Sequence, residues 1–297
     1  MRRKARRAPR LVDGDNFLFR LFQEILEVNT EVADQVVDLV VGSAAIWFPP
    51  NVYKAMPVLL PWVVRDAKCR PHTKGGIRYP DQWAAPDEHG FLRDDNSLIK
   101  GIPKSLSILS DTNDHLDGYR LGKSWVAAHV WREVNLERLA SRDPRLNSFV
   151  PNLVWLPQQI AKLSDQEGSL LQTALKRASW SIYRNLEVNE AVRDEVEKIW
   201  SLLPQAEDSS RPFAGTFNFF DAHEKFLKSR SVSLRTTTRL LSRILNDGEL
   251  PTKGRTPPRY YHGIQKLPSK KLETLSAFLE PYERAIVEEL KILGKSV

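Results

Sequence analysis

The strongest constraint on the fold is the order of secondary structure predicted near the middle of the chain. Residues 124–131 have the pattern of a strand, and His129 lies near its end. A polar loop with a short helix follows. Asn152 then opens a second apolar strand over residues 153–156, and Pro157 can occupy the first turn of a short helix. Strand, loop, strand and helix is the order of a ββα finger.

Two short motifs within this stretch carry a family resemblance. The sequence AHVW at 128–131 followed by PNLVWLP at 151–157 resembles the HNH, or His-Me finger, endonucleases. That family places a histidine at the end of the first strand and an asparagine at the start of the second. The resemblance implies that His129 is the general base that activates water, and that Asn152 orients the finger or binds the metal. It also implies a Mg²⁺ or Mn²⁺ ion that offsets charge on the scissile phosphate.

The chain departs from the family pattern at two positions. Ala128 stands where an acidic residue or a histidine often binds metal, and Ala161 stands where the helix usually supplies a histidine. Some branches of the family work with one histidine and a metal held by asparagine. Further oxygen ligands are available from Asp165, Gln159 and Glu133. We take Asn152 and Asp165 as the expected metal ligands; the competing interpretation makes His129 an ordinary core histidine.

Positive charge is concentrated in two segments, although the whole chain carries only +7. Residues 1–10 hold six Lys or Arg and no acid, and residues 225–271 hold twelve Lys or Arg against two acids. The remaining residues are therefore acidic overall. Two cationic segments on an acidic body favour a polyanionic partner such as DNA, while a basic tail can also be simply a solvated chain end.

The second cationic segment has a regular pattern. Arg235, Arg239 and Arg243 recur every fourth residue in a predicted helix at 231–246, so they span about 12 Å along one flank. The segment that follows adds more cations around two tyrosines. The expected nucleic-acid contacts are therefore Arg235, Arg239, Arg243, Lys253, Arg255 and Arg259.

The class of protein is limited by what the sequence lacks. The most apolar stretch, residues 36–48, carries Asp38 and stops at Pro49, so no membrane span is predicted. One cysteine, Cys69, cannot form an intramolecular disulfide, and no signal peptide is evident. These observations predict a cytoplasmic protein that does not contact a membrane.

The predicted fold is mainly α, within the α+β class, with an embedded ββα-metal finger. Amphipathic helices are expected at 17–26, from about residue 30 to Pro49, and at 169–183, 188–203, 231–246 and 272–290. The predicted organisation is a basic arm at 1–10, a helical region at 11–66, a loop-rich region at 67–118, the finger with its following helix at 119–185, and a helical basic region at 186–297.

Together these features predict a metal-dependent DNA endonuclease of the restriction or defence type. A homodimer or a partner protein of a defence system is compatible with this prediction. The alternatives are a non-catalytic DNA-binding protein with a degenerate finger, and an RNase.

Overall fold

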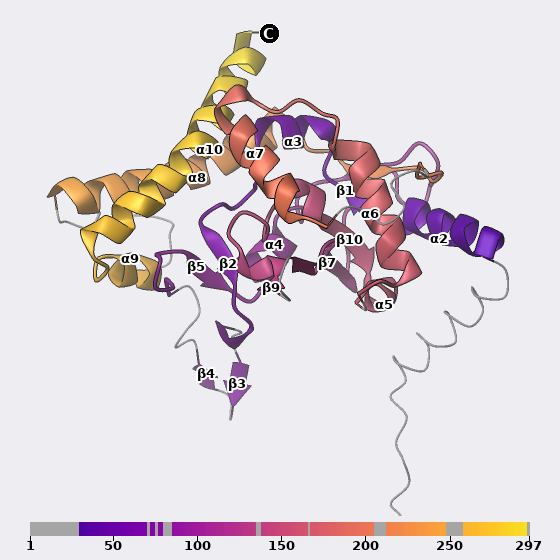
Figure 1. Ribbon diagram of the computed structural model, residues 1–297, viewed down its shortest axis with the longest axis horizontal. Helices are drawn as coiled ribbons and strands as arrows, with labels where there is room; N and C mark the ends of the chain where they lie inside the picture. Colours follow the sequence, from indigo (N-terminus) through magenta and orange to yellow (C-terminus); the bar gives the residue numbers. More distant parts are fainter. Residues whose placement is uncertain are drawn as a thin grey trace, which may run out of the picture.

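A mixed five-stranded sheet lies at the centre of the computed structural model, with helices around it (Figure 1). The structure describes residues 30–69, 72–74, 77–79, 85–134, 138–165, 167–204, 212–247 and 258–295. None of the helices in these ranges combines the length and apolar character needed to cross a membrane. The predicted arm at 1–10 and the predicted helix at 17–26 lie outside the described residues.

The elements alternate between short strands and longer helices. The helices are α2 (Thr30–Ala44), α3 (Pro50–Ala55), α4 (Ser97–Gly101), α5 (Gln158–Leu163), α6 (Leu170–Tyr183), α7 (Glu190–Leu202), α8 (Glu224–Asp247), α9 (Pro258–Ile264) and α10 (Ser269–Lys295). The strands are β1 (Ile46–Trp47), β2 (Val63–Arg65), β3 (His72–Lys74), β4 (Ile77–Tyr79), β5 (Leu92–Asp94), β6 (Ile108–Leu109), β7 (Trp125–His129), β8 (Glu133–Val134), β9 (Arg138–Leu139), β10 (Leu153–Pro157) and β11 (Asn218–Phe220). Short 3₁₀ turns lie at Ala67–Cys69, Ala140–Arg142 and Val150–Asn152.

The central sheet has the strand order β6-β11-β1-β10-β7. Strands β1 and β11 are parallel, and the other neighbours are antiparallel. Helix α2 packs against α6, and the long helices α8 and α10 pack against each other. Figure 1 shows these two helix pairs on different sides of the sheet. Strand β7 is therefore an edge strand, and it carries His129 at its end.

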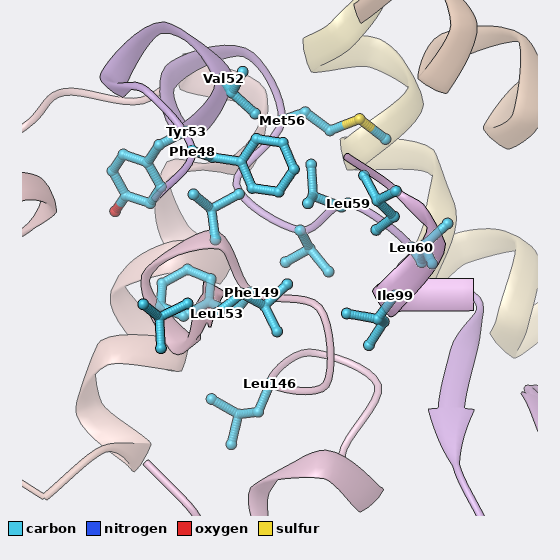
Figure 2. Packing of buried hydrophobic residues seen from close by; sticks show 14 of the residues in the cluster. Phe48, Val52, Tyr53, Met56, Leu59, Leu60, Ile99, Leu146, Phe149 and Leu153 are labelled. Carbon is cyan, nitrogen blue, oxygen red and sulfur yellow. The ribbon is translucent and has the colours of Figure 1, made fainter. Parts of the chain in front are cut away.

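The core is built from aromatic side chains that meet edge to face. Phe48 lies 5.3 Å from the Trp155 ring, and Trp155 lies 5.2 Å from Phe220. Figure 2 shows how Phe48 and Tyr53 pack near Phe149, which belongs to the loop between β7 and β10. Such edge-to-face pairs add about 0.5–1.5 kcal/mol each to the stabilisation from burial. The loop that follows His129 is thus anchored in the main hydrophobic core.

Most of the predicted helices are confirmed, although α8 begins at Glu224 and not near residue 231 as predicted. Capping residues explain where two of them, α6 and α7, begin. Helix α6 starts after Ser169, whose side-chain oxygen accepts a hydrogen bond from the Gln172 backbone N–H at 3.2 Å. Helix α7 starts after Asn189, which accepts from the Ala191 N–H at 3.0 Å. Helix α10 continues through Pro281, which lies inside it.

One helix prediction is wrong at its C-terminal end. The helix predicted from residue 30 to Pro49 ends at Ala44, and Ile46–Trp47 form strand β1. Both side chains are buried, and β1 pairs with β10 on one side and with β11 on the other. A continuous apolar run has no periodicity that separates a buried helix from a buried strand, so only pairing with distant strands decides the outcome.

The prediction of a mainly helical α+β protein is confirmed at the level of class. The five strands of the central sheet come from four of the ranges named above, namely 11–66, 67–118, 119–185 and 186–297. In the described residues, these four ranges therefore contribute strands to the same sheet and side chains to the same hydrophobic core.

Candidate functional site

His129 lies where the sequence places it, at the end of β7. Its backbone is paired with Leu153 at the start of β10, and the register continues to Trp125 opposite Pro157. Helix α5 follows β10 directly and contacts both strands. The order strand, loop, strand and helix is therefore present with the contacts of a ββα unit; its identity as a metal finger stays a prediction.

The His129 imidazole is held in one orientation by a backbone carbonyl. Its Nε2 lies 3.0 Å from the carbonyl oxygen of Asn147, in the loop between β7 and β10. Because a carbonyl oxygen can only accept a hydrogen bond, Nε2 carries the hydrogen in the neutral ring. Nδ1 then bears the lone pair, which makes it the atom that can accept a proton.

The surroundings of His129 keep its imidazole neutral. Burial lowers its pKa from the ordinary 6.5 to about 4, because the charged ring is poorly solvated there. The bond to the Asn147 carbonyl acts in the opposite direction, and the positive charges of Arg65 and Arg132 lower the pKa further. At neutral pH the ring is therefore an unprotonated base close to positive charge.

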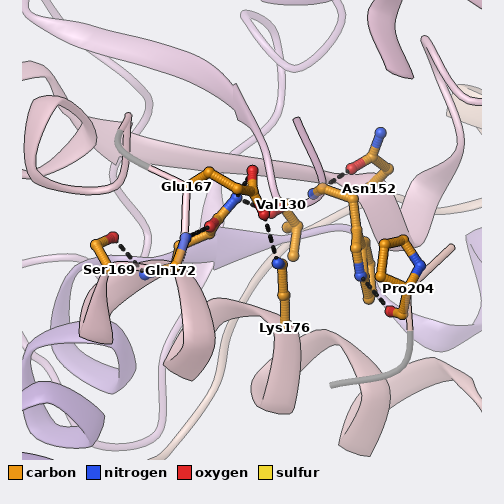
Figure 3. Close-up of polar contacts among 9 residues, drawn as sticks. Val130, Asn152, Glu167, Ser169, Gln172, Lys176 and Pro204 are labelled. Carbon is orange, nitrogen blue, oxygen red and sulfur yellow. Dashed lines mark hydrogen bonds and ion pairs between the residues drawn. The ribbon is translucent and has the colours of Figure 1, made fainter. Parts of the chain in front are cut away.

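Asn152 closes the loop that begins after His129 (Figure 3). Its Oδ1 accepts a hydrogen bond from the Trp131 backbone N–H at 2.8 Å, and its Nδ2 donates to the Leu146 carbonyl at 3.0 Å. The Asn152 carbonyl also accepts from the Val130 N–H at 3.0 Å. Asn152 is fully buried. Its hydrogen bonds to Trp131 and Leu146 connect the two ends of the loop. This geometry favours the orienting role over metal binding, because the amide oxygen already has a partner in the protein.

A second set of contacts fixes the residues immediately after His129. Gln172 on α6 donates to the Val130 carbonyl at 3.3 Å, and its side chain is in turn bonded to Glu167 (Figure 3). Lys176 completes the group through an ion pair with Glu167 at 2.8 Å. The Trp131 indole N–H donates to the Pro204 carbonyl at 3.1 Å. The position of the His129 backbone is thus determined by helix α6 as well as by the sheet.

His129 lines an open pocket of about 220 Å³ together with three arginines. Arg65 comes from the end of β2, Arg132 lies in the loop three residues after His129, and Arg142 ends a 3₁₀ turn. The Ser141 side chain belongs to the same lining. Within the described part of the chain none of the three guanidiniums forms an ion pair. Such a pocket suits an anion with several oxygen atoms, since guanidinium groups recognise phosphate oxygens well.

These three arginines are not among the site residues predicted from the sequence. Arg132 lies three residues after His129, which is a signal that could have been used. Arg65 and Arg142 belong to segments whose approach to His129 depends on the packing of β2 against the Ala140–Arg142 turn.

Neither of the two predicted metal ligands, Asn152 and Asp165, lines the pocket that holds His129. Asp165 is exposed just after α5 and is not part of the pocket lining. Among the described residues no three His, Cys, Asp or Glu side chains gather in a way that could hold a metal ion. The donors that line the pocket are arginine, serine and histidine, so this set does not fit Mg²⁺, which prefers carboxylate and other oxygen ligands. The requirement for Mg²⁺ or Mn²⁺ stays a prediction.

The predicted DNA-contacting arginines lie along α8. Arg239 and Arg243 are exposed, whereas Arg235 is paired through Nε with Glu283 of α10 at 3.6 Å. Lys253 and Arg255 lie outside the described residues, and Arg259 belongs to α9, where its side chain is not described.

Comparison of the chain with protein-family models, with curated proteins and with solved structures gave no match.

Proposed function

We propose that this protein is a DNA endonuclease of the restriction or defence type, and that it acts in the cytoplasm by hydrolysing phosphodiester bonds in the pocket that holds His129. One observation carries the proposal: an imidazole with a basic Nδ1 lies in the same pocket as three arginines that form no ion pair among the described residues. A base beside an anion-binding surface is the arrangement that phosphodiester hydrolysis needs.

In the proposed reaction a water molecule attacks the phosphorus atom while Nδ1 of His129 takes one of its protons. A bond forms between the water oxygen and phosphorus, and the bond from phosphorus to the leaving sugar oxygen breaks. The leaving oxygen takes a proton from solvent, and His129 returns its own proton to solvent. Arg65, Arg132 and Arg142 offset the negative charge that builds up on the phosphate oxygens.

The role of Asn152 in this proposal is positional. Its amide oxygen holds the backbone N–H of Trp131, two residues after the proposed base, and its amide nitrogen holds the Leu146 carbonyl. Displacing a general base by about 1 Å can reduce the rate about a hundredfold. Asn152 is therefore a positioning residue, not a group that touches substrate.

A specific observation favours a second candidate function, a non-catalytic DNA-binding protein. An imidazole whose pKa is lowered to about 4 is a weak base, and the described pocket lining offers no carboxylate for a metal. An RNase is the third candidate, because guanidiniums bind the phosphates of both nucleic acids.

The test is a plasmid-nicking assay with Mg²⁺, with Mn²⁺ and with EDTA, run beside a parallel assay on labelled RNA. We expect His129→Ala to abolish nicking while folding and DNA affinity stay nearly unchanged, because a general base acts in the chemical step. His115→Ala is the matched control, since His115 is exposed and is not part of the pocket lining.

Each alternative predicts a different result. Undiminished nicking by folded His129→Ala protein would overturn the assignment of the base. DNA binding without cleavage under every metal condition would support the non-catalytic protein, and cleavage of RNA alone would support an RNase. Nicking that persists in EDTA would contradict the Mg²⁺ or Mn²⁺ requirement that the family resemblance implies, and it would agree with a reaction in which the three arginines offset the phosphate charge.

A further inference from the structure

A second cavity, of about 460 Å³, lies away from the His129 pocket. It is formed where the chain between α4 and β6 meets the N-terminal part of α8, so it borders the β6–β11 end of the sheet. His129 belongs to β7 at the opposite end of that sheet. The two cavities have no lining residue in common.

Positive charge dominates the polar lining of this cavity. Arg120, Lys225 and Arg230 contribute three cations, and Asp221 contributes the single carboxylate. That carboxylate is already engaged, because it pairs with His223 and accepts a hydrogen bond from the Ser107 hydroxyl at 3.3 Å. The cavity therefore has an excess of positive charge that its own lining does not neutralise.

Arg230 is the most unusual of these cations because it is partly withdrawn from water. Its Nε is buried and has no hydrogen-bond partner among the described residues, and its guanidinium lies 5.9 Å from the centre of the Phe226 ring. Burial lowers its pKa, which shows that the protein solvates this charge poorly. A poorly solvated charge costs free energy, and an anion in the cavity would offset the charge of the Arg230 guanidinium.

One side of the cavity is apolar. Ile102, Leu106 and Phe226 form it, and the Phe226 ring stands next to the Arg230 guanidinium. The volume is within the range of small-molecule sites. An aromatic and aliphatic wall beside a cluster of cations matches a ligand that has both a flat ring system and a phosphate.

We propose that this cavity binds a nucleotide, with its phosphate on Arg120, Lys225 and Arg230 and its base against Ile102, Leu106 and Phe226. The nucleotide is either a free mononucleotide or one unit of a bound strand. The proposal does not depend on the nuclease function, because it concerns a separate cavity and is measured by binding.

The first experiment is a calorimetric titration of the full-length protein with adenosine monophosphate, with adenosine and with inorganic phosphate. We expect adenosine monophosphate to bind at least tenfold more tightly than adenosine, and phosphate to compete with it. Arg230→Met and Lys225→Met should each weaken nucleotide binding at least tenfold. Lys228→Met is the matched control, because Lys228 is an exposed lysine of the same helix that pairs with Glu224 and does not line the cavity.

Thermal unfolding separates binding from a structural role for Arg230. Without ligand, Arg230→Met should melt at or above the wild-type temperature, because it removes a poorly solvated charge. Adenosine monophosphate should raise the melting temperature of the wild type but not that of Arg230→Met. Lys225 is exposed, so Lys225→Met provides a folded variant if Arg230→Met fails to fold.

Three results would overturn the proposal: no saturable binding of adenosine monophosphate at millimolar concentration, equal binding by Arg230→Met, Lys225→Met and Lys228→Met, or equal affinity for adenosine. Competition between adenosine monophosphate and a single-stranded decanucleotide that depends on Arg230 would identify the site as part of a strand-binding surface. Binding of the mononucleotide without such competition would identify a free nucleotide as the ligand.

Discussion

At the scale of single residues, His129 and Asn152 stand at the two ends of one loop and contribute in different ways. His129 uses one ring nitrogen to bind a carbonyl and keeps the other for a proton. Asn152 uses both its amide oxygen and its amide nitrogen in bonds to the backbone. His129 is thus available to accept a proton, and Asn152 keeps the loop backbone in position.

The lowered pKa of His129 predicts a pH dependence of stability. Well above pH 6.5 the ring is neutral in both the folded and the unfolded chain, so it adds no pH dependence there. As pH falls from 6.5 toward 4, the unfolded chain binds a proton that the folded chain does not, and stability falls. The loss reaches about 3 kcal/mol near pH 4.

The measurement is urea unfolding of the wild type and of His129→Gln between pH 7.5 and pH 4. Glutamine does not titrate, so the wild type should lose more stability than the variant across this interval. Parallel curves for the two proteins would mean that the folded ring protonates near its ordinary pKa.

For Asn152, the structure predicts a cost in stability as well as in activity. Asn152→Ala leaves the Trp131 N–H and the Leu146 carbonyl buried without their partner. Each unsatisfied group costs about 1–3 kcal/mol, so we expect a loss of roughly 2–6 kcal/mol together with a fall in turnover by orders of magnitude. Chemical denaturation and the nicking assay measure the two effects separately.

Asn152→Asp distinguishes the positioning role from a metal-binding role. A carboxylate can still accept from the Trp131 N–H and can bind Mg²⁺, but it has no N–H to donate to the Leu146 carbonyl. If Asn152 positions the loop, the aspartate variant should be both less stable and less active than the wild type. Wild-type activity in Asn152→Asp would instead favour metal binding at this position.

At the scale of elements, α8 is an amphipathic helix with two different faces. Leu234, Leu240 and Leu241 are buried, and the helix packs against α10. Arg239 and Arg243 are exposed on the other flank. Because Arg235 is paired with Glu283, the three arginines predicted from the sequence are not equivalent.

This difference predicts unequal contributions to DNA binding. Replacing Arg235, Arg239 and Arg243 together with Gln should weaken DNA binding and flatten its salt dependence. Each lost phosphate contact reduces the log–log salt slope by about 0.9 for duplex DNA. Because Arg235 is paired with Glu283, most of the change should already be present in the Arg239→Gln, Arg243→Gln double variant.

Binding titrations at several salt concentrations give the slope for each variant. Arg284→Gln is a suitable control, because Arg284 is an exposed arginine of α10 that pairs with Glu280. An unchanged slope in the triple variant would mean that these arginines do not contact DNA phosphates.

At the scale of the whole molecule, a buried ion pair connects α2 with α6. The Arg177 guanidinium donates to Asp38 at 2.7 Å, and both side chains are almost completely buried. The second carboxylate oxygen of Asp38 accepts from the Ala214 N–H, so the pair also holds the chain that leads into β11. One carboxylate thus joins three segments that are far apart in the sequence.

Breaking this pair should destabilise the fold. Asp38→Asn leaves the Arg177 charge buried without its counter-ion, and we expect a loss of about 3–5 kcal/mol in urea unfolding. Glu197→Gln, which removes an exposed partner of Arg184, is the control and should cost less than about 1 kcal/mol. Equal effects of the two variants would show that the Asp38–Arg177 pair contributes no more than a surface pair.

Elements whose signals are local were predictable from the amino-acid sequence. Strands β7 and β10 and helix α5 were predicted to within about two residues, because each has its own apolar pattern and Pro157 marks the junction of β10 with α5. The position of His129 near the end of its strand follows from the same pattern, whereas its pairing with Leu153 was found only in the structure. The helix boundaries set by Ser169 and Asn189 are local for the same reason, since a cap needs only neighbouring backbone groups.

Features that join distant segments depend on the three-dimensional packing of the chain and could not be predicted from local patterns. Strand β1 was mistaken for the end of a helix, because its apolar residues become a strand only through pairing with β10 and β11. The arginines around His129 come from three separate segments, and no spacing in the sequence relates Arg65 to Arg142. The bonds of Asn152 to Trp131 and Leu146 also depend on how the loop folds back on itself. Local patterns specify elements because their interactions lie within a few residues, whereas a site assembled from several segments exists only when the core brings those segments together.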